Sequence, residues 1–426
     1  MGQFDNLAPG CLDGVTILDF TWVLAGPHAT KMLADMGATV IKVEPYAIGA
    51  NERHMLLIKT VNGVQQSSYS INVNRGKKSI SLNLTKPEAR EIVAGLIKRA
   101  DVLIENFTPG VMERLGLGYE AVKTLKEDII YCSLSCYGHW GPYSNRPGYD
   151  IIAQGAAGVS SMYETPQGSP VTVGDIIAGL NAAIGILGAL YAKRLTGRGQ
   201  NIDISMMDSL LSVNENFLPW YTMSQTVGDE LDAAPLGRYY DDYAPYGIFQ
   251  GRDGRVNIAS LDEKRWPGLV AAMGEEYAWL MDDPRTVDVS TRCRNGIWLN
   301  KTIDEWVMSM DSVEEVERLL MEAGVACQRV LSIPELVDTD PHVKAREMIV
   351  ELDQPFLGTI KLCNSPIKMS ETPSCMRGYG PLLGEHTDEI LADVLGYNEE
   401  QIKGLHEAGV VYREPAVDRL KKEQQG

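Results

Sequence analysis

An aspartate between a glycine and a long apolar segment is the residue in this chain best suited to covalent chemistry. Asp175 follows Gly174 and precedes the segment 176–195, which reads as a helix that is apolar on nearly all sides. A carboxylate can act as a nucleophile toward a thioester or an anhydride and carry the acyl group. The same residue also stands where an N-cap is expected, accepting backbone N–H bonds at the positive end of the helix. The local sequence leaves both roles open.

The predicted helix contains three glycines, Gly179, Gly185 and Gly188. Each lowers helix propensity by about 1 kcal/mol relative to alanine, and the usual compensation is close approach of another backbone. We therefore expect a buried helix. It ends at the sequence Thr-Gly-Arg-Gly (196–199), and the alternating segment 201–205 that follows is typical of a strand.

A compact basic turn offers a second kind of chemistry. Arg75, Lys77 and Lys78 lie in the sequence Asn-Arg-Gly-Lys-Lys. The chain has a net charge of −18 and a pI near 4.8, so an anionic ligand needs a local group of cations. These residues could bind phosphate groups, or they could equally be a solvated run of charge.

Short apolar runs alternate with amphipathic segments through the first half of the chain, which predicts an α/β fold of the doubly wound, Rossmann-like kind. Residues 15–45 form one βαβ unit without the GxGxxG sequence, so a dinucleotide redox cofactor is poorly supported. Ligands of such folds sit at the carboxyl ends of the strands. Those ends carry Glu44, Asn106, Tyr137 and the loop at Gly138. The predicted strands are 15–20, 39–43, 79–84, 101–105, 128–135 and 201–205.

The pattern changes after Ser212, which predicts more than one domain. We expect a large Rossmann-like domain over 1–212, a linker over 213–224 and a small α+β domain over 225–330. A hairpin at 246–259 and helices with acidic faces belong to the small domain. Residues 331–426 are expected to form a second linker and return to the large domain. We read 46–70 and 213–245 as loops.

Composition excludes several classes of protein. Hydrophobic residues make up 44% and charged residues 23%, as in ordinary globular enzymes. The acidic net charge argues against nucleic acid or an anionic membrane as a partner. The longest apolar run, 176–192, is short for a membrane span. The seven cysteines are scattered without CxxC spacing and the amino terminus has no signal pattern, so we expect a cytoplasmic protein with no metal site.

Six stretches, in order and at compatible spacing, resemble the class III coenzyme A transferases, the group of formyl-CoA, carnitine and bile acid CoA-transferases. The resemblance runs over nearly the whole chain. The stretches are LAGPHATKMLADMGATVIKVEP, NRGKKSISLNL, ADVLIENFTPGVMERLG, VGDIIAG followed by TGRGQNIDISMMDSLL, PYGIFQGRDG and LLGEHTDEIL.

The resemblance implies an activity and an assembly. Coenzyme A would pass from an acyl-CoA to a free carboxylic acid through a covalent aspartyl intermediate, first a mixed anhydride and then an aspartyl-CoA thioester. CoA would be a substrate, with no tightly bound cofactor. The chain would be a ring in an interlocked homodimer, with sites at the contact of large and small domains from both chains.

The resemblance also implies site residues. Asp175 matches the aspartyl nucleophile, and Tyr149 and Asp150 match an active-site tyrosine and acid. Leu82, Asn106 and Arg114 match CoA contacts. Leu24 stands where formyl-CoA transferase has a glutamine that orients the intermediates, so leucine argues against oxalate as the acceptor.

The small domain is expected to supply the backbone donors that stabilise the oxyanion, from the segment 235–247. That segment contains only two glycines, Gly237 and Gly247, fewer than in the formyl-transferring members. The aromatic and acidic cluster 239–243 matches a mobile cover over the site. Such a cluster could favour a cationic or bulky acid, or could be an exposed loop outside the site.

Two alternatives belong to other classes. A 2-methylacyl-CoA racemase of the same fold would need two bases flanking the α-carbon. The racemases have a histidine where this chain has Tyr149, and a tyrosine is a weak base at neutral pH. His139 is the nearest alternative base but does not fit the racemase pattern. A non-catalytic acyl-CoA-binding protein is disfavoured because Asp175 is intact.

Overall fold

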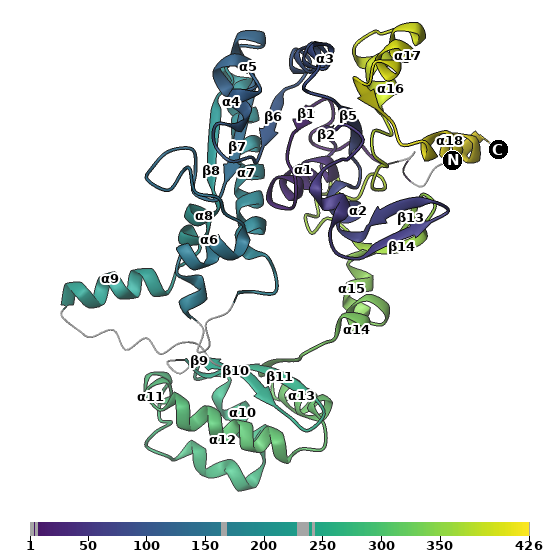
Figure 1. Ribbon diagram of the computed structural model, residues 1–426. Helices are drawn as coiled ribbons and strands as arrows, with labels where there is room; N and C mark the ends of the chain where they lie inside the picture. The colour runs from purple at the N-terminus through teal and green to yellow at the C-terminus, as the bar shows by residue number, and fades with distance from the viewer. Residues whose placement is uncertain (1–3, 5–6, 163–167, 228–237, 241–242, 426) are drawn as a thin grey trace. The chain divides into compact units, whose positions relative to one another are not determined.

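A seven-stranded sheet lies at the centre of the larger of two units into which the chain divides (Figure 1). The computed structural model describes residues 4, 7–162, 168–227, 238–240 and 243–425. The first unit comprises Met1–Ala157, Gly168–Glu215 and Pro341–Gly426. The second comprises Gly158–Gln167 and Asn216–Asp340.

The sheet has the strand order β15-β5-β2-β1-β6-β7-β8 and is parallel except for the edge strand β15. Apolar runs fill its interior, because a parallel sheet is covered on both faces. The α/β class expected from the sequence is confirmed. The strands are β1 (Thr16–Asp19), β2 (Thr39–Pro45), β5 (Lys78–Leu82), β6 (Val102–Glu105), β7 (Ile130–Ser135), β8 (Asn201–Ser205) and β15 (Val411–Tyr412).

The order of strands reverses between β1 and β6. From β1 the chain continues to β2 and β5 on one side, then returns to place β6, β7 and β8 on the other. The loops that leave β1 and β6 therefore run in opposite directions and open a crevice at the carboxyl ends of these strands. This switch point is where a ligand site is expected.

Helices cover both faces of the sheet. One face packs against α3 (Pro87–Ile97), α5 (Tyr119–Leu125) and the π-helical turn η4 (Ile390–Val394), in a core of buried Leu, Ile and Val side chains. The other packs against α1 (Ala25–Asp35) and α7 (Val173–Thr196), which also contact each other closely.

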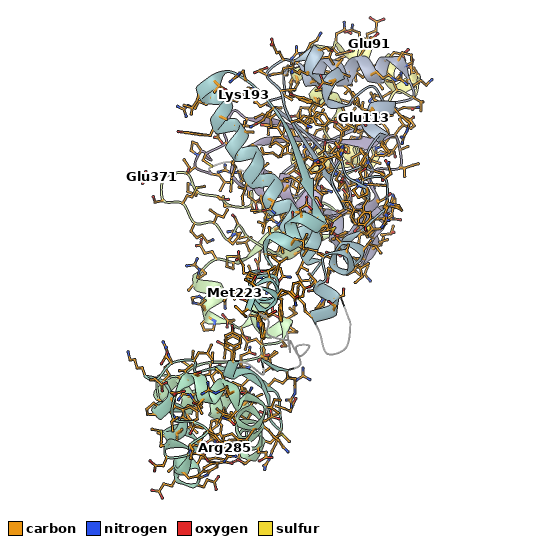
Figure 2. The ribbon with its side chains drawn as sticks, turned by 90° about the vertical axis from the view of Figure 1, so that its left-hand side faces the viewer. Glu91, Glu113, Lys193, Met223, Arg285 and Glu371 are labelled. Carbon is orange, nitrogen blue, oxygen red and sulfur yellow. The ribbon has the colours of Figure 1, made fainter. Side chains whose placement is uncertain are left out.

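Helix α7 begins at Val173, two residues before Asp175, and its N-cap is Thr172. The expectation that Asp175 is the N-cap is therefore wrong: this residue lies inside the first turn. The helix ends at Thr196, and its C-cap Gly197 has φ 71°, a left-handed conformation that glycine adopts readily. In its last turn Lys193, labelled in Figure 2, pairs with Asp128 at 2.8 Å.

The prediction that α7 is buried is only half right for a single chain. Its small residues face the sheet and α1, whereas Ile184, Tyr191 and Leu195 are 65%, 67% and 69% exposed. By length and composition alone it is the one helix in the described part of the chain that could cross a membrane. Its packing against β7, β8, α1 and α8 (Met206–Ser212) makes it a core helix of this unit.

The segment 46–70, read from the sequence as a loop, contains regular structure, because two short polar strands pair with each other there. The elements of this segment are η1 (Asn51–His54), β3 (Ile58–Val61), β4 (Val64–Ser67) and the start of α2 (Ser68–Asn74). The remaining elements of the first unit are α4 (Val111–Arg114), α6 (Asp150–Ala156), α15 (Pro341–Ala345), β13 (Ile349–Gln354), β14 (Gly358–Cys363), α16 (Thr387–Glu389), α17 (Glu399–Glu407) and α18 (Ala416–Gln425).

The second unit has an antiparallel sheet in the order β12-β11-β10-β9. Its core gathers Phe249, Trp266 and Trp306 with aliphatic residues of the surrounding helices. Helix α9 occupies Phe217–Val227, within a segment read as linker and loop. The other elements are η2 (Val159–Met162), β9 (Tyr239–Tyr240), β10 (Tyr243–Gln250), β11 (Arg255–Ala259), α10 (Trp266–Met273), η3 (Glu275–Met281), α11 (Val289–Arg294), α12 (Gly296–Ser309), α13 (Val313–Glu322), β12 (Ala326–Arg329) and α14 (Ile333–Asp338).

Candidate active site

A pocket of about 100 Å³, partly open to solvent, lies in the first unit at the switch point of the sheet. Its walls come from the segments that follow β1, β6 and β7, together with the loop before α6 and the start of α7. This matches the expected place of a ligand in an open α/β sheet. The lining residues are Trp22, Val23, Ala25, Asn106–Pro109, Leu134–Cys136, Ser144, Arg146–Tyr149, Asp175 and Met206.

Asp175 reaches the pocket from the first turn of α7, where backbone N–H groups and the helix dipole favour a negative charge. The backbone N–H of Ala25, the first residue of α1, acts on the Asp175 carboxylate and lowers its pKa. The amino-terminal ends of two helices thus meet at one carboxylate. This is a setting in which charge that develops during a reaction can be stabilised.

Asp150 has the capping role that the sequence suggested for Asp175. Its buried carboxylate accepts hydrogen bonds through Oδ1 from the N–H groups of Gly174 at 2.7 Å and Asp175 at 3.2 Å. Its Oδ2 accepts from the side chain of Gln154 at 2.6 Å. An acid from α6 therefore satisfies the free donors at the start of α7.

The pKa of Asp175 is raised to about 7, first by burial and then by the negative charge of Asp150. The N–H of Ala25 acts in the opposite direction and is the smaller effect. Desolvation and a neighbouring like charge are the two causes that most often raise the pKa of a carboxyl group in a functional site. At neutral pH, Asp175 is therefore divided between its charged and neutral forms.

Tyr149 and Asn106 also line the pocket. Tyr149 is the N-cap residue of α6 and is 61% exposed. Asn106 follows β6, and its side-chain amide bonds both backbone groups of Trp22, accepting at 2.8 Å and donating at 2.9 Å. Of the predicted residues, the structure brings Asp175, Tyr149, Asp150 and Asn106 together.

The other residues predicted to contact CoA lie in three different settings. Leu24 is the N-cap residue of α1 and is buried beside the pocket residues Val23 and Ala25. The side chain of Leu82 lies in the core at the end of β5, so only its backbone faces the carboxyl edge of the sheet. Arg114 is exposed in α4, five residues beyond the pocket residue Pro109.

The basic turn is not the surface cluster that the sequence suggested. Arg75 is 2% exposed and pairs with Asp35 at 2.6 Å, and the buried Lys77 pairs with Asp19 at 2.9 Å. Lys78 is partly exposed and pairs with Glu389 on α16. A run of charges looks the same in a sequence whether it is solvated or buried beside acids, which is why the pattern misled. Arg75 and Lys77 offer no accessible charge to a phosphate group in this structure.

Sequence reasoning missed Arg146, which lines the pocket, and Tyr69, whose ionisation the acids of the site affect. Among the described residues that line the pocket, Arg146 is the one cation, and its guanidinium lies 3.7 Å from the ring centroid of Tyr143. Burial, followed by the negative charges of Asp175, Glu52 and Asp150, raises the pKa of Tyr69, so its phenol stays protonated beside them. Tyr69 lies in the segment read as a loop, where no periodicity marked it.

His139 does not line this pocket. Its backbone N–H bonds Asp203 at 3.0 Å, and its Nε2 lies 3.5 Å from the buried carboxylate of Glu105. The expected oxyanion loop and the aromatic cluster lie partly outside the described residues, which exclude 228–237 and 241–242, while Gly247 belongs to β10 of the second unit. Within the described ranges, no three His, Cys, Asp or Glu side chains are grouped to hold a metal ion.

Comparison with known proteins shows the family of this chain. Residues 12–387 match the model of CoA-transferase family III. The chain is 34% identical over 410 residues to the succinyl-CoA–L-malate CoA-transferase beta subunit of Chloroflexus aurantiacus, covering 94% of this chain and 98% of that protein. It is 32% identical over 426 residues to a formyl-CoA:oxalate CoA-transferase of Rhodopseudomonas palustris, covering 94% and 97%.

Solved structures agree. A CAIB/BAIF family protein from Brucella suis superposes with a TM-score of 0.80 at 31% identity, covering 91% of this chain and 100% of that one. The motif resemblance, the α/β fold and these matches agree with one another. The chain belongs to CoA-transferase family III and is a class III CoA-transferase, an enzyme that moves CoA between an acyl-CoA and a carboxylic acid.

Proposed function

We propose that this enzyme transfers CoA through covalent intermediates on Asp175. The observation that carries the proposal is the position of this carboxylate in the switch-point pocket, at the amino-terminal ends of two helices and with a pKa near 7. A carboxylate with a raised pKa is more basic than an ordinary aspartate, and a substantial share of it is still ionised at neutral pH. Both properties suit a nucleophile.

The reaction balances without any added reagent. An oxygen of Asp175 attacks the thioester carbonyl, the C–S bond breaks, and CoA leaves as a thiolate from a mixed anhydride. The thiolate then attacks the aspartyl carbonyl, which releases the first acid as a carboxylate and leaves CoA on Asp175. The acceptor carboxylate takes the place of the first acid, and the same two steps run in reverse.

Neighbouring groups have complementary roles in this scheme. The N–H of Ala25 donates toward the charge that moves on and off the Asp175 carboxyl group. Asp150 holds the first turn of α7 through Gly174 and Asp175. Tyr149 borders the reacting acyl group, and Arg146 supplies positive charge to an anionic substrate in an acidic protein. Among the predicted CoA contacts, Arg114 has an accessible charge.

We further propose a cytoplasmic enzyme that forms a ring-shaped, interlocked homodimer. The exposed apolar side chains Ile184, Tyr191 and Leu195 on α7 support a second chain at this helix, because side chains of this kind gain free energy when a partner covers them. The relatives act on dicarboxylic acids, which makes malate, succinate and mesaconate the first acceptors to test.

The test is a panel of acyl-CoA donors and free acids analysed by mass spectrometry, with Asp175→Ala as the comparison. We expect transfer by the wild-type enzyme and a loss of several orders of magnitude in the variant, as for removal of a nucleophile. Full activity of Asp175→Ala would reject the mechanism.

A second arm of the same test addresses the racemase alternative. A 2-methylacyl-CoA is incubated with the enzyme in D2O while transfer is measured in parallel. Asp175 and Tyr149 both line the pocket, and its described lining residues include no histidine, so we expect transfer without exchange of the α-proton. Deuterium uptake that depends on Asp175 and is faster than transfer would favour the racemase.

A further inference from the structure

The turn between β1 and α1 is held by side chains at almost every backbone group. Asp19 accepts from the N–H of Thr21 at 2.9 Å, and Lys42 donates to the carbonyl of Thr21 at 2.7 Å. Asn106 bonds both the N–H and the carbonyl of Trp22. Turns are usually held by their own backbone or by water, so this degree of side-chain bonding indicates a conformation that has to be enforced.

Val23, the next residue of this turn, has the backbone conformation that these contacts enforce. Its φ is 62°, in the left-handed region that a β-branched residue strongly disfavours. Such a conformation is strained and persists only where the surroundings fix it. The N–H of Val23 donates to Glu52 Oε2 at 2.9 Å, so Glu52 is the group that holds this residue.

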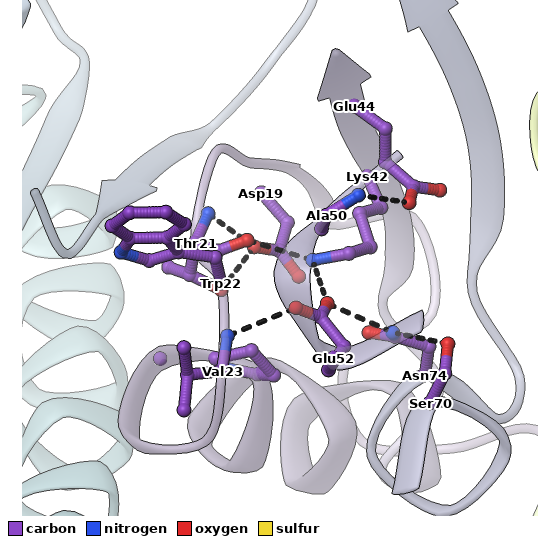
Figure 3. Close-up of polar contacts among 12 residues, drawn as sticks. Asp19, Thr21, Trp22, Val23, Lys42, Glu44, Ala50, Glu52, Ser70 and Asn74 are labelled. Carbon is purple, nitrogen blue, oxygen red and sulfur yellow. Dashed lines mark hydrogen bonds and ion pairs between the residues drawn. The ribbon is translucent and has the colours of Figure 1, made fainter. Parts of the chain in front are cut away.

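Glu52 is fully buried and is bonded on both oxygens (Figure 3). Its Oε1 lies 2.9 Å from the ammonium of Lys42 and accepts from the side chain of Asn74 at 3.1 Å. Lys42 stands on β2, and Asn74 ends α2. The carboxylate is therefore held by the sheet and by a helix. Its hydrogen bond with the N–H of Val23 holds that residue in turn.

The turn leads directly to the pocket. Two residues after Val23, Ala25 lines the same pocket as Asp175, and its backbone N–H favours the charged form of that carboxylate. On the other side, Gly179 of α7 lets the backbone of Ala25 come close, because a Cβ at Gly179 would lie 2.6 Å from the Ala25 carbonyl oxygen. The direction of the Ala25 N–H is thus set from the turn and from α7 together.

We propose that Glu52 is a positioning residue for the CoA-transfer reaction: by holding Val23 in its left-handed conformation, it aims the backbone N–H of Ala25 at the Asp175 carboxylate. The proposal rests on the proposed role of Asp175. Glu52 does not line the pocket, so it acts through the turn rather than on the substrate. Its loss should slow the covalent steps and leave acyl-CoA binding nearly unchanged.

The test compares Glu52→Asp with Glu44→Gln. The aspartate keeps the charge beside Lys42 but is one methylene too short to reach the N–H of Val23. Glu44, on β2, is the control: it is as buried as Glu52, pairs with Arg53 at 2.6 Å and accepts from the N–H of Ala50 at 3.1 Å, but it makes no bond to the turn. Single-turnover formation of the CoA adduct at saturating acyl-CoA is measured beside the KM for acyl-CoA.

We expect Glu52→Asp to slow adduct formation by about 10- to 100-fold with KM changed less than about twofold, as for an interaction that acts in the transition state. The acid limb of its pH–rate profile should move to higher pH, since Asp175 loses a donor while the charges of Asp150 and Glu52 remain. Glu44→Gln should lose stability but keep its adduct rate within about threefold. Equal slowing in both variants would overturn the proposal.

A double-mutant cycle identifies the route of the effect. Glycine accepts a positive φ without strain, so in Val23→Gly the hydrogen bond to Glu52 is no longer needed to hold this conformation. Glu52→Asp should therefore slow the reaction by less than about threefold in the Val23→Gly background. An undiminished effect there would show that Glu52 does not act through Val23.

Two further observations keep the outcome decisive. If Glu52→Asp does not fold, hydrogen exchange of the peptide 20–26 is measured in the wild-type enzyme instead. Exchange as fast as in an exposed loop would contradict the proposal that Glu52 holds this turn. If the wild-type enzyme forms no adduct, the proposed function fails, whereas an adduct formed equally fast by Glu52→Asp rejects only the role of Glu52.

Discussion

At the scale of single residues, Asp150 contributes to the ionisation of Asp175. Burial, and after it the negative charge of Asp150, raises the pKa of Asp175 to about 7. Replacing Asp150 with Asn removes the charge but keeps an oxygen that can accept from Gly174. The pKa of Asp175 should fall, so the acid limb of the pH–rate profile should move below pH 7. Asp203→Asn, outside the pocket, is the control, and an equal shift there would argue against this cause.

The raised pKa of Asp175 also costs stability. Above about pH 4 the unfolded chain ionises this carboxyl more readily than the folded chain, so stability is lost as the pH rises from about 4 to about 7. Asp175→Asn should therefore be the more stable protein at pH 8, by on the order of 1–3 kcal/mol, and gain little at pH 4. Urea unfolding at both pH values measures this, and an equal gain at both would contradict it.

Residue types predicted the centre of the site better than its surroundings. Asp175 could be singled out because the family motif surrounds it. The burial of Arg75 and Lys77 could not be foreseen, because their partners Asp35 and Asp19 are 40 and 58 residues away in the chain. Tyr69 gave no signal in a segment without periodicity. Contacts of this kind depend on the tertiary fold, which a local pattern does not contain.

At the scale of elements, the site depends on how closely α1 and α7 approach. Gly179→Ala would place a Cβ 2.6 Å from the carbonyl oxygen of Ala25, so the first turn of α1 must move. We expect a loss on the order of 2 kcal/mol in stability and at least about tenfold in the rate of adduct formation. Gly404→Ala in α17 is the control, because a Cβ there meets nothing within 4 Å.

A stable and fully active Gly179→Ala enzyme would show that this approach does not matter.

The main strands and helices were predictable because the buried parallel strands are apolar and the helices amphipathic. The pair β3 and β4 was missed, since strands such as Val64–Ser67 are short and polar. The sequence prediction began α7 nearly one turn too late, with Asp175 as its N-cap. The start of a helix can be capped by a distant residue, here Asp150, and the local sequence does not show this.

At the scale of the whole molecule, strand order decides where the chemistry lies. The chain reverses its direction of winding at β1 and β6, and the segments after these two strands supply Val23, Ala25 and Asn106 to the pocket. The sequence predicted the class of sheet and the use of its carboxyl edge. It did not predict between which two strands the crevice would form, because that depends on pairing between distant segments.

The exposed apolar side chains of α7 lead to a prediction about assembly. We expect a homodimer of twice the chain mass of 46.9 kDa that persists on dilution. Ile184→Asp combined with Tyr191→Asp should weaken it, since both side chains would carry charge into a covered surface. Light scattering measures both proteins, and a wild-type monomer at working concentration would reject the dimer.

The central claim is that CoA becomes covalently attached to Asp175 during turnover. Wild-type enzyme is mixed with an acyl-CoA, digested and analysed by mass spectrometry, with Asp175→Ala treated in the same way. We predict that the peptide containing Asp175 gains the mass of CoA less one water, that hydroxylamine releases it, and that the variant gains nothing. Rapid CoA transfer without an adduct at Asp175, or with an adduct on another residue, would contradict the account.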